Sequence, residues 1–166
     1  MTRTTTVVTA GVDTHAEVHH AAALDQYGHL LGTRAFPATT KGYRQLLAWL
    51  HGHGAVQRVG VEGTGSYGAG LTRTLRAAGV QVIEINRPHA HTRARRGKTD
   101  AIDAKAAARK VQSGDCQAIP KDTTGVIEAI RQLHLVRASA VKARTAALTQ
   151  MGEVLVTAPA TVRESV

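Results

Sequence analysis

Residues 6–36 read TVVTAGVDTHAEVHHAAALDQYGHLLGTRAF, and this stretch decides the fold. The apolar and β-branched pattern predicts strands over residues 6–13, 19–24 and 29–36. The last two are joined by the tight turn Asp-Gln-Tyr-Gly at 25–28. Because short turns connect strands that run in opposite directions, the sequence predicts an antiparallel meander at the start of the chain.

Alternating helices and strands follow the meander. The predicted elements are a helix from Thr40 that ends at Gly52 and Gly54, a strand from Val56 to Glu62, a helix that begins with a Ser66 cap and ends at Gly79, a strand from Val80 to Ile85, and a helix from Lys98 to Val111. The order β-β-β-α-β-α-β-α predicts an α/β fold with a mixed sheet. It is the order of the ribonuclease-H-like (RuvC-like) fold, an analogy that by itself assigns no function.

A second region is predicted beyond Gly114 and Pro120, where residues 123–155 have the pattern of one long helix. The seam of this helix has alternate spacings of four and three residues: Ala129, Leu133, Val136, Ala140, Ala143 and Ala147. This spacing is typical of a coiled coil, which would make the protein a homo-oligomer. A helix packed back on its own domain explains the spacing equally well. We therefore expect a domain over residues 1–118, a long helix over 122–156 and a flexible tail over 157–166.

The composition is strongly basic, with 21 Lys and Arg residues against 12 Asp and Glu residues, a net charge of +9 and a pI near 10.4. Such a balance favours a polyanionic partner, nucleic acid before a membrane. Aromatic residues make up only 3% of the chain, so contacts to phosphate rather than base stacking must dominate. The single cysteine, Cys116, and the lack of a signal-peptide or membrane-spanning pattern predict a cytoplasmic protein.

Four carboxylates form the candidate catalytic and metal-binding site. Asp13 and Glu62 end apolar runs, so both are expected at the tips of neighbouring parallel strands. Asp100 and Asp103, three residues apart, share one face of the next helix. Carboxylates suit Mg²⁺, with Mn²⁺ as a substitute, and two such ions roughly 3.5–4 Å apart catalyse phosphoryl transfer. Each acid taken singly has a structural explanation, as a turn cap or beside a helix N-terminus.

Bases surround this site in the sequence. Between residues 87 and 110 eight bases accompany only the two acids Asp100 and Asp103: Arg87, Arg93, Arg95, Arg96, Lys98, Lys105, Arg109 and Lys110. A solvated charge run is the ordinary explanation, but the adjoining acids favour contacts to nucleic-acid phosphates. The glycine-rich run at 63–68 is weak as a nucleotide signature and is expected to be the turn that positions Glu62. Among the histidines, only His15 is a candidate to contact a metal-binding acid without binding the metal itself.

Three blocks of the chain resemble those of the DEDD insertion-sequence transposases, the family of the Piv DNA invertase and the bridge-RNA-guided recombinases. They are Gly11-Val12-Asp13-Thr14-His15, Val61-Glu62-Gly63-Thr64-Gly65-Ser66-Tyr67 and Lys98-Thr99-Asp100-Ala101-Ile102-Asp103-Ala104. The resemblance implies a RuvC-like domain in which Asp13, Glu62, Asp100 and Asp103 bind Mg²⁺. It also implies a prokaryotic, nucleoid-associated enzyme that acts on DNA with a structured guide RNA.

In that family a coiled coil precedes a C-terminal domain with a serine nucleophile, and the two domains share one active site. No residue here matches the serine motif, so we expect an N-terminal portion that is incomplete alone. The main alternatives are a nucleic-acid-binding and dimerisation module without activity and a self-sufficient RuvC-like junction nuclease. An ATPase lobe of the sugar-kinase or actin type is disfavoured, since such proteins duplicate the fold in a longer chain.

Overall fold

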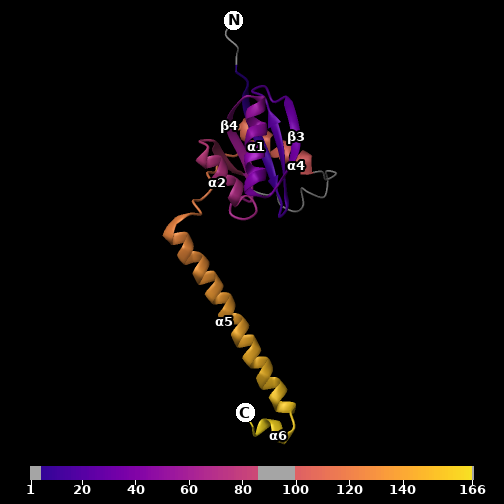
Figure 1. Ribbon diagram of the computed structural model, residues 1–166, viewed down its shortest axis with the longest axis vertical. Helices are drawn as coiled ribbons and strands as arrows, with labels where there is room; N and C mark the ends of the chain where they lie inside the picture. Colours follow the sequence, from indigo (N-terminus) through magenta and orange to yellow (C-terminus); the bar gives the residue numbers. More distant parts are fainter. Residues whose placement is uncertain (1–4, 86–99, 166) are drawn as a thin grey trace. The chain divides into compact units, whose positions relative to one another are not determined.

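The computed structural model describes residues 5–85 and 100–165 (Figure 1). The chain divides into two compact units, residues 1–121 and 122–166. The first unit contains β1 (Val7–Thr14), β2 (Val18–Leu24), β3 (Leu30–Pro37), α1 (Thr40–His53), β4 (Ala55–Glu62), α2 (Ala69–Ala77), β5 (Gln81–Ile85) and α4 (Asp100–Ser113). The second contains α5 (Gly125–Thr157) and α6 (Ala160–Arg163).

The sheet of the first unit has five strands in the order β3-β2-β1-β4-β5. The pairs β1–β2 and β2–β3 are antiparallel, which confirms the predicted meander. The pairs β1–β4 and β4–β5 are parallel, as a crossover through a helix requires. Val12 of β1 pairs with Val61 of β4, so Asp13 and Glu62 follow at the same end of adjacent strands.

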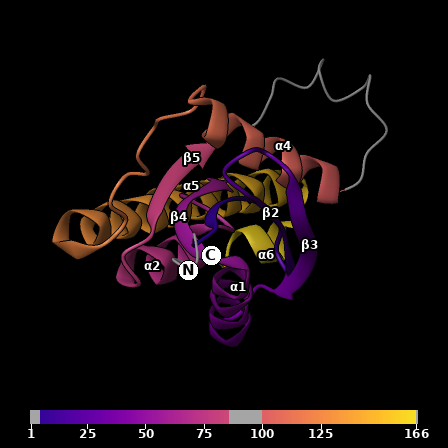
Figure 2. The ribbon, with the colours of Figure 1, turned by 90° about the horizontal axis from the view of Figure 1, so that it is seen from above.

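Helices cover both faces of this sheet (Figure 2). Large aliphatic side chains of α1 and α2, including Leu46 and Leu71, complete one core with β-strand residues such as Val12 and Val61. On the other face α4 packs through small residues, and Val111 and Ala107 join the side chains of β5. The helix α4 therefore lies across the sheet on the side opposite α1 and α2.

The element boundaries differ from the predicted ones in two places that have a physical reason. Helix α1 continues through Gly52 to His53 and ends at Gly54, whose amide donates to the carbonyl of His51. The prediction that Ser66 caps a helix was wrong. Its hydroxyl donates to the carbonyl of Gly63 at 3.2 Å, within a series of turns, and α2 begins only after Gly68.

In the second unit α5 is a single helix of 33 residues, close to the predicted length. None of its residues is buried. Its large apolar side chains are exposed: Val126, Ile127, Ile130, Leu133, Leu135, Val136, Val141, Leu148, Met151, Val154 and Val156. Within its own unit, α5 therefore buries little apolar surface.

The five-stranded mixed sheet, with helices between its parallel strands, is the arrangement of the ribonuclease-H-like fold. The predicted fold class is thus confirmed, including the long helix that follows. Among residues 5–85 and 100–165, no helix is both long and apolar enough to cross a membrane.

Candidate metal centre

Asp13 lies at the end of β1, on the face of the sheet that α4 covers. Gly11 is on that face, because a Cβ atom there would meet the backbone of α4. Side chains alternate along a strand, so Asp13 is on the same face, together with its cross-strand partner His20. Asp13 is only 2% exposed. Its carboxylate is therefore enclosed by β2 on one side and by α4 above.

Two glycines allow α4 to approach the sheet closely. A Cβ atom at Gly11 would lie 2.2 Å from both the carbonyl oxygen of Ala104 and the amide nitrogen of Ala108. One at Gly60 would lie 2.6 Å from a valine methyl of α4. Real Cβ atoms do not come this close, so the contact requires glycine at both positions. The helix lies directly on β1, and its first residue is Asp100.

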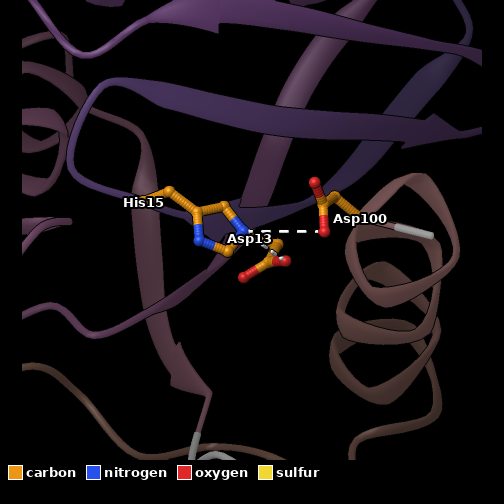
Figure 3. Close-up of side chains that lie close together, drawn as sticks. All are labelled: Asp13, His15 and Asp100. Atoms are coloured by element: carbon orange, nitrogen blue, oxygen red, sulfur yellow. Dashed lines mark hydrogen bonds and ion pairs between the residues drawn. The ribbon is translucent and has the colours of Figure 1, made fainter. Parts of the chain in front are cut away.

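Two histidines join Asp13 and Asp100 into one cluster. The Nε2 atom of His15 lies 3.1 Å from Oδ2 of Asp13 and 3.8 Å from Oδ1 of Asp100 (Figure 3). The Nε2 atom of His20 lies 3.3 Å from the other oxygen of Asp100, Oδ2. Asp100 and His15 are about half exposed, whereas Asp13 is enclosed. The cluster thus has a buried floor and an open side.

The donor set fits a divalent cation. One ligand atom each from Asp13, His15 and Asp100 lies within 4.8 Å of the others. The second oxygen of Asp13, Oδ1, is buried and accepts no hydrogen bond from any residue that the structure describes. A buried carboxylate oxygen without a donor is unfavourable, and a cation would satisfy it. Carboxylate and imidazole are both common ligands of divalent ions in proteins.

The remaining two predicted carboxylates lie nearby but outside this group of ligand atoms. Glu62 ends β4 beside Asp13, is 6% exposed, and accepts a 2.7 Å hydrogen bond at its backbone carbonyl from the hydroxyl of Thr14. Asp103 is half-buried, one turn along α4 from Asp100. Within the described part of the chain the close group therefore contains two of the four predicted acids.

A hollow of about 500 Å³ opens beside the cluster. Its walls come from the β1–β2 hairpin, from the turn after β4 and from the start of α4: His15, Ala16, Glu17, Val18, His20, Tyr67 and Asp100. The open side of the acid and histidine cluster therefore faces this hollow.

Three of the eight predicted phosphate-binding bases lie on α4. Lys105 and Lys110 are half-buried and Arg109 is exposed. The other five predicted contacts, Arg87, Arg93, Arg95, Arg96 and Lys98, lie outside the described residues.

His20 is the residue of the cluster that the sequence did not single out. Its place follows from the register of the β1–β2 hairpin, in which Asp13 pairs with His20 and Gly11 with Ala22. The signal was available in principle, because a hairpin loop of known length fixes which residue faces Asp13. The predicted strand ends, residues 13 and 19, were each one residue away from the observed ends, Thr14 and Val18.

A family model described as a transposase, that of the DEDD transposases of the IS110 type, matches residues 10–158. The matched range includes all four predicted carboxylates and the whole of α5. No curated protein matches the chain.

Proposed function

Because the chain belongs to the DEDD transposase family of the IS110 type, we propose that residues 1–121 are its metal-dependent catalytic unit, which cleaves and exchanges DNA strands. Membership of a transposase family indicates an enzyme that acts on DNA. The metal requirement, the roles of single residues and the need for a further domain are parts of the proposal.

The observation that carries the proposal is the buried carboxylate of Asp13. Its Oδ1 atom lacks a hydrogen-bond donor among the described residues, while His15 and Asp100 face the same carboxylate group from the open side. A structural aspartate in a core is normally satisfied by backbone amides or a cationic side chain. An enclosed acid with an unpartnered oxygen beside two further ligands supports a cation-binding role better than a structural one.

In this proposal the ion is a divalent cation, Mg²⁺ or Mn²⁺, held by Asp13, Glu62, Asp100 and Asp103. When bound, such an ion activates the attacking oxygen and stabilises the leaving oxygen of a phosphodiester. The chain itself supplies position: β1 and β4 fix Asp13 and Glu62 from the sheet, and α4 supplies Asp100 from above. The Gly11 contact determines how far these two sets of ligands are from each other.

The charge distribution supports binding to the nucleic-acid backbone. Between Asp25 and Glu84 the chain has a single acid, the buried Glu62. The same stretch has six bases: Arg34, Lys41, Arg44, Arg58, Arg73 and Arg76. We propose that DNA phosphates are bound mainly by the bases from Arg87 to Lys110, next to the acids. A structured guide RNA, which the family resemblance implies, would bind as a second polyanion.

We further propose that α5 pairs with α5 of a second copy as a coiled coil, making the transposase a homo-oligomer. The exposed apolar residues of α5 support this. A serine nucleophile from a further domain would complete the reaction.

The experiment is a calorimetric titration of the purified chain with Mg²⁺ and with Mn²⁺. Wild type is expected to bind both ions, and the Asp13→Asn/Asp103→Asn double variant to bind neither. Asp115→Asn, which removes an exposed acid outside the cluster, is the matched control and should bind like wild type. Equal binding by the double variant and wild type would contradict the proposed site.

A nucleic-acid-binding and dimerisation module without activity is the second candidate, favoured by the unburied apolar surface of α5. The two functions differ in a nicking assay on supercoiled DNA with Mn²⁺. Nicking that disappears in the double variant supports the catalytic unit. Unchanged DNA affinity in the double variant, with no nicking by wild type, supports the binding module.

A further inference from the structure

Imidazole nitrogens accompany the carboxylates around Asp13. The Nε2 atom of His15 faces two oxygens from different elements, 3.1 Å to Asp13 at the end of β1 and 3.8 Å to Asp100 at the start of α4 (Figure 3). A histidine that only caps one carboxylate needs a single such contact. The Nε2 atom of His15 therefore borders, together with the two acids, the position where a shared cation would lie.

The spacing of these atoms is that of ligands on one ion. Two ligand atoms that are each about 2.0–2.3 Å from a cation lie roughly 2.8–4.6 Å from one another. Both distances from His15 Nε2, 3.1 and 3.8 Å, fall in that range. These two separations are therefore compatible with His15 binding one ion together with Asp13 and Asp100.

An independent observation also indicates a ligand at this place. Asp13 is 2% exposed, and its Oδ1 atom has no hydrogen-bond partner in residues 5–85 and 100–165. The contact with His15 involves the other oxygen, Oδ2. The histidine alone therefore leaves half of the buried carboxylate unsatisfied, and a cation beside it would satisfy both oxygens.

His20 contacts the second carboxylate oxygen of Asp100. Its Nε2 atom lies 3.3 Å from Oδ2, while Oδ1 faces His15. Because His20 is fixed in β2 opposite Asp13, it can orient the exposed carboxylate of Asp100 toward the cluster. Such contacts behind a ligand fix its orientation and raise metal affinity.

We propose that His15 is a direct metal ligand beside Asp13 and Asp100, and that His20 is the positioning residue of Asp100. The inference rests on the proposed metal site and specifies its ligands. Imidazole is a ligand that transition ions accept and Mg²⁺ disfavours. The centre should therefore select a first-row transition ion such as Mn²⁺ over Mg²⁺.

The test uses Mn²⁺ as the probe, since its unpaired electrons report on nearby nuclei. The full chain, free of any histidine tag, is loaded with one equivalent of Mn²⁺ and studied by pulsed electron paramagnetic resonance. The expected result is modulation from a coordinated ¹⁴N nucleus that changes to the ¹⁵N pattern when histidine is ¹⁵N-labelled. A histidine that only hydrogen-bonds to a bound carboxylate would give no such directly coordinated signal.

Variants assign the signal to a residue. His15→Gln keeps a hydrogen-bond donor but should abolish the nitrogen signal and weaken Mn²⁺ binding more than tenfold, with less than about threefold change for Mg²⁺. His20→Gln should keep the nitrogen signal and lower the affinity for both Mn²⁺ and Mg²⁺ by about tenfold. His29→Gln is the matched control. His29 lies outside the cluster, with its Nδ1 atom 3.0 Å from Oδ2 of Asp25, so its substitution should change the affinity for neither ion.

The outcomes separate this inference from the proposed function. Absence of any metal binding to the folded wild type would overturn both. Metal binding without a histidine nitrogen signal would overturn only the assignment of His15. A signal that persists in His15→Gln and disappears in His20→Gln would likewise overturn it, by giving the ligand role to His20. Thermal unfolding curves of each variant confirm that the protein compared is folded.

Discussion

The two faces of the central sheet are packed in different ways. On the face of α1 and α2, large side chains such as Leu46 and Leu71 are fully buried. On the face of α4, Gly11 lies against the backbone at Ala104 and Ala108, and Gly60 lies against the side chain of Val111. A buried leucine contributes about 1.5–3 kcal/mol, and an alanine much less. The first face therefore supplies most of the stability. The second face buries less apolar side-chain area, and its close packing lets α4 bring its acids to the sheet.

The largest expected effect on stability comes from truncating a leucine on the first face. Leu46→Ala should lower the free energy of unfolding by about 2–5 kcal/mol, because it removes a buried side chain and leaves a cavity. Urea denaturation measures this loss. Mn²⁺ affinity of the remaining folded protein should stay at the wild-type value. A parallel loss of Mn²⁺ affinity would mean that the two faces are not separable.

A smaller effect on stability but a larger one on the site is expected from Gly11→Ala. The added methyl group would lie 2.2 Å from backbone atoms of α4, so the helix must move away from β1. Such overpacking costs about 1–3 kcal/mol. Because Asp100 begins α4, Mn²⁺ binding should be lost in calorimetric titration while the protein remains folded.

The control for Gly11→Ala is Gly52→Ala in α1, where an added Cβ meets no atom within 4 Å. Alanine there should raise the free energy of unfolding by about 0.5–1 kcal/mol, since glycine is unfavourable inside a helix. Wild-type Mn²⁺ binding by Gly11→Ala would contradict the role assigned to this contact.

The sequence predicted the second face less completely than the first. The spacing of apolar residues predicted α1, and Gly79 gave the end of α2. The spacing of Asp100 and Asp103 shows that they share a helical face, but not toward which part of the sheet that face points. The rotation of α4 about its axis is fixed by the contact of Ala104 and Ala108 with Gly11, and no periodic pattern in the sequence predicts this contact. For the same reason the pairing of His15 with Asp100 depended on tertiary packing.

Neighbouring histidines of β2 give a third way to compare the faces. His19 is fully buried on the α1 side and stacks on Tyr43 with ring centroids 5.5 Å apart, whereas His20 contacts Asp100 on the α4 side. Burial lowers the pKa of His19 below its ordinary value of 6.5. The unfolded chain therefore binds a proton more readily than the folded one.

It follows that stability due to a neutral His19 is fully present above pH 6.5 and is lost as the pH falls toward the lowered pKa. The slope is at most about 1.4 kcal/mol per pH unit for one group. Urea denaturation at several pH values between about 7.5 and 5 measures this slope of the free energy of unfolding. His19→Leu should remove this slope. An equal slope in His19→Leu would assign the pH dependence to other groups.

The smallest effect is expected outside both faces, on α5. Arg131 and Gln132 hydrogen-bond to Glu128 and lower its pKa to about 2. This local support is present above the ordinary carboxyl pKa of 4.5 and is lost as the pH falls through about 2. Since the pair is exposed, Glu128→Gln should slightly reduce the helical circular dichroism signal at pH 7 and leave the unfolding of the first unit unchanged. A shift in that unfolding transition would mean that the effect of Glu128 is not confined to α5.

The exposed apolar surface of α5 has a consequence for how the protein responds to dilution. None of the residues of α5 is buried. If a second copy covers it, as proposed, the equilibrium is second order in protein concentration. The helix content of residues 125–157 then rises with concentration by mass action, whereas the β-sheet unit is equally folded at all concentrations. Synthesis level would set the fraction of paired helices, and thereby the amount of assembled transposase.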